Sequence, residues 1–358
     1  MRFVHIADIH FDAPFISLKN TEYLVEQRKL EQRNIFKKVI EYINKEKIEY
    51  LFISGDLYEN EYIKKSTIEY INNQFKLIPE TKIFIAPGNH DPNVKGSFYD
   101  TYEFAPNVKI FKTNNIEKYT DDNIEIYGFG FNDFYMNNSP IEKFYLEESI
   151  KPKVLIMHGD LNGGVDSKGL SYNPVSEKLL NSFKFDYIAM GHIHKNNFEN
   201  NRKIIYPGSL LSLGFDEIGK HGMIVGDISN NKLNLEFVEL DEREFAQIEI
   251  EIDNMFSQND IIEYINTMYV EKNKLCKVIL KGNRKFVINT REILRFINNE
   301  NIIKIKDETK IGYDLEEISK ENTLRGIFVR KLLEKLKSGI YTEDEIEKAI
   351  EIGLEAME

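Results

Sequence analysis

Five short polar segments of this chain each begin where an apolar, strand-like run ends. The preceding runs read RFVHIA, YLFIS, KIFIAP, KVLIM and DYIAM. Ligands of α/β proteins bind in the crevice at the carboxyl ends of the strands. One such segment would say little, but five in succession predict a single shared site. The segments are Asp8-Ile9-His10, Gly55-Asp56, Gly88-Asn89-His90-Asp91, His158-Gly159-Asp160 and Gly191-His192-Ile193-His194.

The residue types in these segments indicate a metal centre. Carboxylates, an amide and several imidazoles form a mixed oxygen and nitrogen set that suits Mn²⁺, Fe²⁺ or Zn²⁺. The set exceeds what one catalytic ion with open positions needs. We therefore expect two ions that share a carboxylate, lying about 3.5–4 Å apart, with a metal-activated water as the nucleophile. Polar side chains that only cap turns at the strand ends are the alternative.

Strand-like runs alternate with helical stretches from residue 1 to residue 240. Residues 21–45 place apolar side chains at helical spacing, and a second helix is expected over 62–77. The later part of this region is richer in strands, which predicts a layered α/β sandwich. Strands are expected near 82–86, 108–111, 124–129, 153–157, 186–190, 203–206, 222–228 and 232–240.

The remaining sequence divides into a small α/β module and a helical end. Strands are expected at 246–253, 275–282 and 302–309, with helices near 258–271 and 290–299 between them. The segment LRGIFVRKLLEKL is helical in pattern and stops at Gly339, and Thr342 and Glu345 predict a capping box for a last helix. The predicted domains are residues 1–240, 241–310 and 311–358.

The charge of the chain is acidic overall but basic in one place. The net charge of −12 argues against a simple DNA-binding protein, which usually has a basic face. Between Lys272 and Arg295, however, stand eight basic residues and one acidic residue. Two interpretations stay open, a solvated strand edge and helix face or a track for the phosphate backbone of DNA. In the second, Lys281, Arg284 and Lys285 would contact DNA.

The N-terminal sequence does not predict a membrane-directed segment. MRFVHIAD reaches a carboxylate at Asp8, too early for the apolar region of a signal peptide. No apolar run approaches the length that spans a bilayer. We expect a soluble, cytoplasmic protein without a membrane partner.

The motifs D-x-H, GD, GNHD, HG and GHxH, in this order, resemble those of the calcineurin-like metallophosphoesterases. ADIHFDAPF, GDLYEN, YPGSLLSLGF and LRGIFVRKLLEKL are similar to segments of the SbcD-type DNA-repair exonucleases, in particular the bacterial YhaO-like subgroup. The resemblance implies a four-layer α-β-β-α sandwich with a small α/β capping domain and C-terminal helices.

The resemblance also implies which residues hold the two ions. The shared ligand would be Asp56, and Mn²⁺ would be the favoured metal, with Fe, Zn or Mg as alternatives. The first ion would take Asp8, His10, Asp56 and His194, and the second Asp56, Asn89, His158 and His192.

Two further residues of the GNHD segment are candidate catalytic residues, His90 through the same resemblance and Asp91 through its position next to it. His90 would contact the scissile phosphate and assist the leaving group. Asp91 would either orient the His90 ring or cap the turn before Pro92. One departure stands out, because Glu59 occupies a position where archaeal and eukaryotic relatives often have histidine, which puts a second catalytic histidine in doubt.

The implied function is a DNA exo/endonuclease subunit that acts with an SbcC-type, SMC-like ATPase, and the resemblance allows a homodimer. The C-terminal helices would either dock that ATPase or cover their own domain. A stand-alone phosphoesterase for a small molecule is the first alternative, which fits the acidic charge but leaves residues 241–358 without a role. A catalytically inactive scaffold is the second, and the complete ligand set with His90 argues against it.

Overall fold

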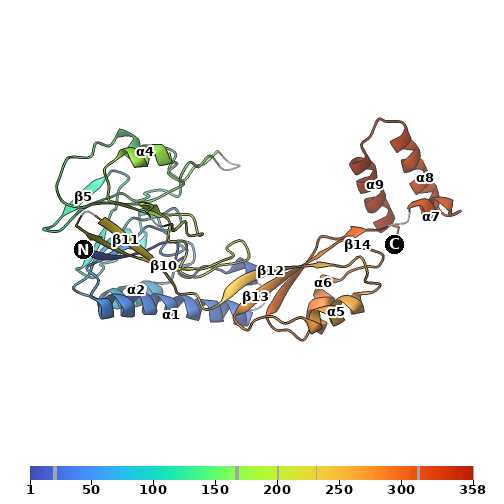
Figure 1. The fold of residues 1–358 in the computed structure, drawn as a ribbon, viewed down its shortest axis with the longest axis horizontal. Coiled ribbons are helices and arrows are strands. Elements are labelled where there is room, and N and C mark those ends of the chain that lie inside the picture. Colours follow the sequence, from blue (N-terminus) through green and yellow to red (C-terminus); the bar gives the residue numbers. More distant parts are fainter. Residues whose placement is uncertain (19–21, 166–168, 200, 231, 313–314, 358) are drawn as a thin grey trace. The chain divides into compact units, whose positions relative to one another are not determined.

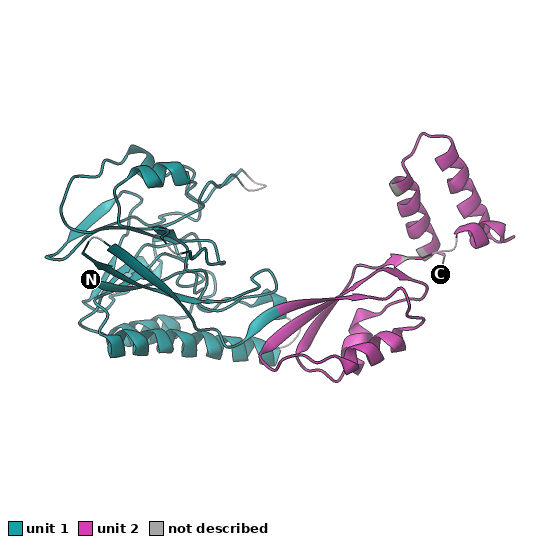
Figure 2. Ribbon diagram, viewed as in Figure 1, with its two compact units in different colours: residues 1–245 teal, residues 246–358 magenta. Residues whose placement is uncertain are grey.

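The computed structural model describes residues 1–358 except 19–21, 166–168, 200, 231, 313–314 and 358. The chain separates into two compact units, residues 1–245 and residues 246–358 (Figure 2). The C-terminal helical segment, residues 311–358, belongs to the second of these units, whereas the sequence pattern predicts it as a domain of its own. Residues 21 and 313–314, which the sequence assigns to helical segments, lie outside the described residues.

A six-stranded sheet forms one half of the first unit. Its strand order is β11-β10-β1-β2-β3-β4, in which β1 to β4 are parallel and β10 is antiparallel to both of its neighbours, β1 and β11. Strands β1 to β3 come from apolar runs that precede polar segments, and all four residues of β2 are buried. The bounds are β1 Arg2–Ile6, β2 Tyr50–Ile53, β3 Lys82–Ile85, β4 Val108–Ile110, β10 Gly222–Ser229 and β11 Lys232–Glu239.

A five-stranded sheet forms the other half, in the order β5-β6-β7-β8-β9. Its strands β6 to β9 are parallel, and β5 pairs with β6 in the antiparallel sense. The sequence did not predict β5, because EKYT is polar and only half-buried at an edge. The bounds are β5 Glu117–Thr120, β6 Glu125–Gly128, β7 Lys153–His158, β8 Tyr187–Gly191 and β9 Ile204–Ile205.

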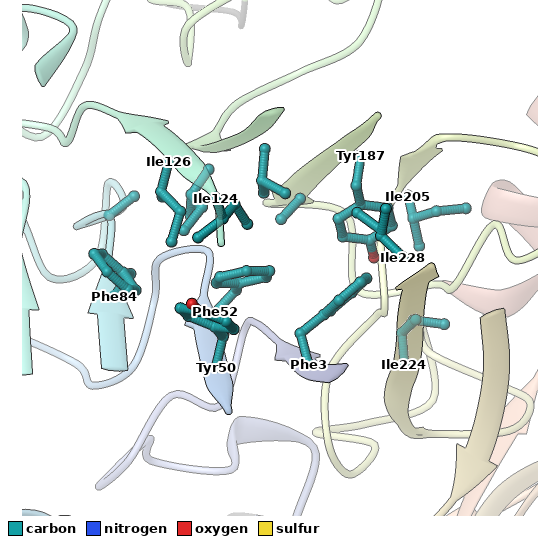
Figure 3. Close-up of a cluster of buried hydrophobic side chains, with 14 of the residues drawn as sticks. Phe3, Tyr50, Phe52, Phe84, Ile124, Ile126, Tyr187, Ile205, Ile224 and Ile228 are labelled. Atoms are coloured by element: carbon teal, nitrogen blue, oxygen red, sulfur yellow. The ribbon is translucent and has the colours of Figure 1, made fainter. Parts of the chain in front are cut away.

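The two sheets enclose an aromatic and aliphatic core (Figure 3). Phe3 packs against Phe52 and against Tyr187, with ring centroids 5.2 and 4.7 Å apart, which joins β1 and β2 to β8. Alternate residues of β7 and β8, such as Leu155 and Ile188, face away into a second apolar cluster. Both faces of this sheet are therefore buried, as parallel strands require.

Helices cover the outer faces of the sandwich, which gives the four α-β-β-α layers that the family resemblance implies. Helices α1 (Glu22–Glu46) and α2 (Lys65–Phe75) lie side by side under the six-stranded sheet (Figure 1). Helix α1 buries a stripe that includes Phe36, Val39 and Ile43, so the predicted helix is confirmed. Short helices complete the layers: η1 Ile16–Leu18, α3 Phe98–Thr101, η2 Pro140–Lys143 and α4 Glu177–Ser182.

The second unit begins with a three-stranded sheet, in the order β12-β13-β15. Helices α5 and α6 share an apolar cluster with these strands, which confirms the predicted strand and helix order of this module. A two-stranded pair of β14 with β16 was not predicted, because each strand has only two residues. The bounds are β12 Glu244–Glu251, α5 Gln258–Thr267, β13 Lys274–Lys281, β14 Asn283–Arg284, α6 Thr290–Phe296, β15 Ile302–Asp307 and β16 Lys310–Ile311.

The C-terminal part consists of α7 (Leu315–Lys320), α8 (Leu324–Lys337) and α9 (Glu343–Glu355). The predicted capping box of α9 is confirmed, with reciprocal hydrogen bonds between Thr342 and Glu345. These helices bury a small cluster of their own. Among the described residues, no helix is both long and apolar enough to cross a membrane.

Candidate metal centre

The polar segments that follow five parallel strands converge at one end of the sandwich. In the six-stranded sheet they follow β1, β2 and β3, and in the five-stranded sheet they occupy the ends of β7 and β8. His158 is the last residue of β7 and pairs in register with Gly191 of β8. Backbone hydrogen bonds join the loops, since His10 N–H donates to the carbonyl of Asp56 at 2.9 Å. The predicted crevice therefore draws on both sheets.

Close backbone approaches and unusual torsion angles hold these loops in place. A Cβ atom on Gly191 would lie 1.8 Å from the carbonyl oxygen of Ser54, which explains why glycine precedes the first histidine of GHxH. Asp8, His10 and Asp56 have φ angles of 52°, 53° and 53°. Such left-handed conformations cost non-glycine residues about 1–3 kcal/mol each and cluster at functional sites.

The residues expected for the first ion lie together. A ligand atom from each of Asp8, His10 and His194 falls within 4.8 Å of the others. Nε2 of His10 is 3.0 Å from Nε2 of His194, although the two residues come from opposite sheets. Asp8 is fully buried, and its carboxylate also accepts the backbone N–H of His192 at 2.9 Å.

The residues expected for the second ion also lie together. Oδ1 of Asn89 is 3.0 Å from Nε2 of His158 and 3.2 Å from Nδ1 of His192. Oδ2 of Asp56 lies 3.3 Å from Nε2 of His158 and 3.7 Å from Nε2 of His10. One carboxylate oxygen thus faces an imidazole from each of the two sets, which is the position that a shared ligand would occupy.

The hydrogen bonds at Nδ1 of His10 and His194 show whether their Nε2 atoms are free to bind a cation. A carboxylate can only accept, so Nδ1 of His10 donates to Glu59 at 2.7 Å and Nδ1 of His194 donates to Glu217 at 2.6 Å. In the neutral rings both Nε2 atoms then carry lone pairs, and they face each other at 3.0 Å. Two such acceptors repel unless a proton or a cation lies between them.

The second half of the centre repeats this situation. Nδ1 of His158 donates to the carbonyl oxygen of Ser54 at 2.8 Å, which leaves its Nε2 as an acceptor. That lone pair faces the carboxylate of Asp56 and the amide oxygen of Asn89. A group of acceptors turned toward one another is the donor set of a divalent cation site, and the residues present fit two such ions.

Burial and neighbouring charges act on the ionisation of these groups in opposite ways. Burial raises the pKa of Asp8 above its ordinary value, because a charged carboxylate is poorly solvated there. Burial acts on Asp56 in the same sense, but the charged forms of His158 and His10, which hold a proton where a cation would otherwise lie, outweigh it and lower the pKa of Asp56. Burial, with a smaller contribution from His158, lowers the pKa of His192 to about 3 and keeps that ring neutral, as a ligand requires.

The two candidate catalytic residues of the GNHD segment, His90 and Asp91, differ in exposure and in hydrogen-bond partners. The His90 side chain is about half exposed, with a relative accessibility of 46%, and Nδ1 donates to Glu59 at 2.9 Å. Burial disfavours its charged form, but Glu59 and Asp56 outweigh this and raise the pKa of His90 to about 9. The partner that orients His90 is therefore Glu59.

Asp91 is fully buried and serves the loops instead. Its carboxylate accepts the backbone N–H groups of Gly88, Asp56 and Leu57 and the hydroxyl of Tyr99, at 2.7–3.0 Å. Of the two roles considered for Asp91, these contacts match the one that fixes the turn. They also tie the loop after β3 to the loop after β2.

Sequence reasoning missed the roles of two glutamates. In the sequence Glu59 stands out only as a departure from the relatives, and Glu217 carries no signal of its own. Glu217 lies just beyond the YPGSLLSLGF segment, and its carboxylate also accepts the backbone N–H of Leu213 at 3.0 Å. A glutamate close to a quoted motif is a weak signal, because only the fold shows which histidine it reaches.

Part of the basic stretch of the second unit is paired with acidic neighbours. Lys281 forms an ion pair with Glu249 of β12 at 2.7 Å. The Arg284 guanidinium donates to the Thr309 hydroxyl and the Phe286 carbonyl, and its Nε lies 3.7 Å from a carboxylate oxygen of Asp307 in β15. Lys285, by contrast, is exposed. The local excess of positive charge in the sequence is therefore reduced by residues that the sheet brings beside it.

Comparisons with known proteins agree with the geometry of the first unit. Residues 1–196 match the family model of the calcineurin-like phosphoesterases. The chain is 27% identical over 300 residues to the SbcD subunit of nuclease SbcCD from Staphylococcus epidermidis, covering 71% of this chain and 76% of that protein.

Two further relatives extend the comparison. DNA double-strand break repair protein Mre11 of Methanocaldococcus jannaschii is 27% identical over 293 residues, covering 76% of this chain and 75% of the relative. An uncharacterized metallophosphoesterase, YhaO of Bacillus subtilis, is 24% identical over 248 residues. This last match covers 66% of the present chain but only 60% of its relative.

Proposed function

We infer a function from one premise: this chain belongs to the calcineurin-like phosphoesterase family. It is accordingly a metal-dependent phosphoesterase, and the proposal concerns its substrate and partner. We propose that it hydrolyses phosphodiester bonds of DNA in the cytoplasm, as a nuclease subunit that works with an SMC-like ATPase of the SbcC type. The observation that supports the proposal is that the seven side chains expected to act as ligands lie together, in a chain similar to nucleases over most of its length.

The side chains at the crevice divide the work of the proposed reaction. Asp8, His10 and His194 would hold one ion, Asn89, His158 and His192 the other, and Asp56 both. Two bound divalent ions, with Mn²⁺ favoured, would neutralise the phosphate and supply an activated water.

His90 stands beside this set without being needed as a ligand. Its backbone N–H donates to Asp56 at 2.8 Å, and its ring is half exposed. These features support the proposed role, in which His90 would contact the phosphate and donate a proton to the leaving oxygen. A positioned acid of this kind contributes about 10²–10⁴-fold to the rate.

The second unit would supply contacts to DNA, and its three candidate residues are not equivalent. Lys285 is exposed and is the strongest candidate. Lys281 would have to exchange its partner Glu249 for a phosphate. Arg284 already bonds to the loop of its own module, so its loss would affect that module as well as any DNA contact.

The C-terminal helices would dock the ATPase. They bury a core of their own, yet Leu324 and Ile327, three residues apart on α8, remain 72% and 44% exposed. Exchanging both for glutamate should abolish co-purification with an SbcC-type ATPase and leave hydrolysis of a small phosphodiester unchanged. The change Lys331→Gln, at another exposed position of α8, serves as the control.

The deciding assay compares linear DNA with bis-p-nitrophenyl phosphate, each with added Mn²⁺. Hydrolysis of both by the wild-type protein, and of neither by Asp56→Asn prepared in parallel, would support the proposal. The Asp56→Asn preparation also controls for contaminating nucleases. Hydrolysis of neither substrate by a wild-type protein that binds metal would point to an inactive scaffold.

A stand-alone phosphoesterase for a small molecule is the second candidate. The ion pairs that neutralise part of the basic stretch favour it, because they weaken the most obvious DNA-binding surface. It predicts hydrolysis of the small ester alone, with DNA left intact even when the ATPase is present.

A further inference from the structure

Glu59 holds two histidines with one carboxylate. Its Oε1 accepts from Nδ1 of His10 at 2.7 Å, and its Oε2 accepts from Nδ1 of His90 at 2.9 Å. The side chain is mostly buried, with a relative accessibility of 15%. The rings of His10 and His90 also pack edge to face, with centroids 4.9 Å apart. The three side chains therefore form one connected group.

The two histidines have different tasks in the proposed function, on which this inference rests. His10 presents Nε2 to the metal centre, 3.0 Å from Nε2 of His194. His90 lies outside both ligand sets and would act on the phosphate. A carboxylate on Nδ1 fixes the tautomer and the ring plane of a histidine, and losing such a partner typically costs about 10–100-fold in metal affinity.

Glu217 supplies the natural comparison. It holds Nδ1 of His194 at 2.6 Å, and its other oxygen accepts from the Ser209 hydroxyl at 3.2 Å and from the backbone N–H of Leu213. Like Glu59 it is 15% accessible. Glu217 thus hydrogen-bonds to one candidate ligand, His194. Glu59 hydrogen-bonds to a candidate ligand, His10, and also to His90, which would act on the substrate.

We propose that Glu59 is a bridging positioning residue, which couples the ring of the metal ligand His10 to the ring of His90. Metal binding at His10 and correct placement of His90 then depend on the same carboxylate. Glu217 affects metal binding alone. The difference follows from where the second carboxylate oxygen of each glutamate points.

The experiment measures Mn²⁺ affinity by electron paramagnetic resonance and hydrolysis of a small phosphodiester as Mn²⁺ is raised to saturation. Glu217→Ala should lose about 10–100-fold in Mn²⁺ affinity and recover wild-type turnover at saturation. Glu59→Ala should lose a similar affinity but keep a turnover defect at saturation. Glu61→Gln and Asp216→Asn remove the same charge from exposed neighbours and should leave both measurements unchanged.

Two more variants distinguish loss of the hydrogen bonds from Glu59 to His10 and His90 from a nonspecific structural change. Glu59→Gln keeps the shape but offers one acceptor oxygen, so it can serve only one of the two Nδ1–H donors. It should therefore show a turnover defect smaller than that of Glu59→Ala. Combining Glu59→Ala with His90→Ala should be no slower at saturating Mn²⁺ than His90→Ala alone, because both changes remove the same placement of the ring.

Two results would overturn the bridge. If Glu59→Ala regains full turnover at saturating Mn²⁺, as Glu217→Ala should, then Glu59 backs only the ligand. If its Mn²⁺ affinity equals that of the wild type, then Glu59 does not support His10. A wild-type protein that neither binds Mn²⁺ nor hydrolyses the ester would contradict the proposed function instead, so the two failures are distinguishable.

Discussion

The two units of this protein handle charged residues in opposite ways. In the first unit, charged and polar groups that are far apart in the sequence, from Asp8 to His194, meet within hydrogen-bonding distance. In the second unit, basic residues that are adjacent in the sequence meet acidic partners from neighbouring strands, as Lys281 meets Glu249. Closeness in sequence therefore does not predict where charges gather in space. Position at the carboxyl ends of parallel strands predicts it better.

Burial explains why the difference matters. Most of the polar groups at the metal centre of the first unit are buried, where each interaction is strong and an unpaired group is costly. The charges of the second unit are mostly solvated, and solvent screens their interactions. Changes in the first unit should accordingly have the larger effects.

The largest effect is expected from Asp56→Asn. This change removes the negative charge that both ions would share, so both should be lost together. Removal of an outer partner already costs about 10–100-fold in affinity, and loss of a direct shared ligand should exceed that. Metal analysis after dialysis, with hydrolysis measured in parallel, would check it. A variant that keeps one ion at full occupancy would show that the two halves of the centre are independent.

The next effect is expected from His90→Ala, which should slow turnover by about 10²–10⁴-fold and leave two ions bound. The reason is that His90 lies outside both ligand sets and acts only on the substrate. Mn²⁺ titration together with hydrolysis of a small phosphodiester would separate the two properties. Loss of metal in this variant would place His90 among the ligands and blur the distinction made here.

A third effect concerns stability. The Arg28 side chain is almost fully buried, and it bonds to Asp241 at 2.9 Å and to the Ser212 carbonyl at 2.8 Å. Arg28→Ala would leave the buried Asp241 carboxylate without its guanidinium partner and should cost about 3–5 kcal/mol of unfolding free energy. Lys37→Ala on the same helix breaks only an exposed pair with Glu41 and should cost no more than about 1 kcal/mol. Equal losses in urea unfolding would contradict the role given to burial.

The smallest effect is expected in the basic stretch. Lys285→Gln should weaken DNA binding for all sequences and reduce its salt dependence by roughly one unit, because a phosphate contact is lost. Lys281→Gln should do less, because that lysine already has an acidic partner. Fluorescence anisotropy with labelled DNA over a range of salt concentrations would compare them. If neither variant changes the affinity, the second unit contacts a protein rather than DNA.

Much of the fold could be predicted from periodicity. The strands before the five polar segments and the long helix α1 follow from apolar runs and from helical spacing, since burial of one face dictates both patterns. The edge strand β5 and the short pair of β14 with β16 could not be predicted. Their residues are polar or too few to show a hydrophobic periodicity. Whether they form strands therefore depends on pairing with neighbouring strands.

The ligand types and the strand pattern are both local properties, so the sequence alone predicts a metal centre at the ends of parallel strands. Which carboxylates hydrogen-bond to the far side of the candidate ligands depends on the tertiary fold. Glu59 and Glu217 reach His10 and His194 across 49 and 23 positions of the chain. Likewise, Glu249 of β12 and Asp307 of β15 lie beside basic residues of the second unit. Hydrogen bonds and ion pairs act over a few ångströms in space, and no local pattern records which distant carboxylate will lie within that range.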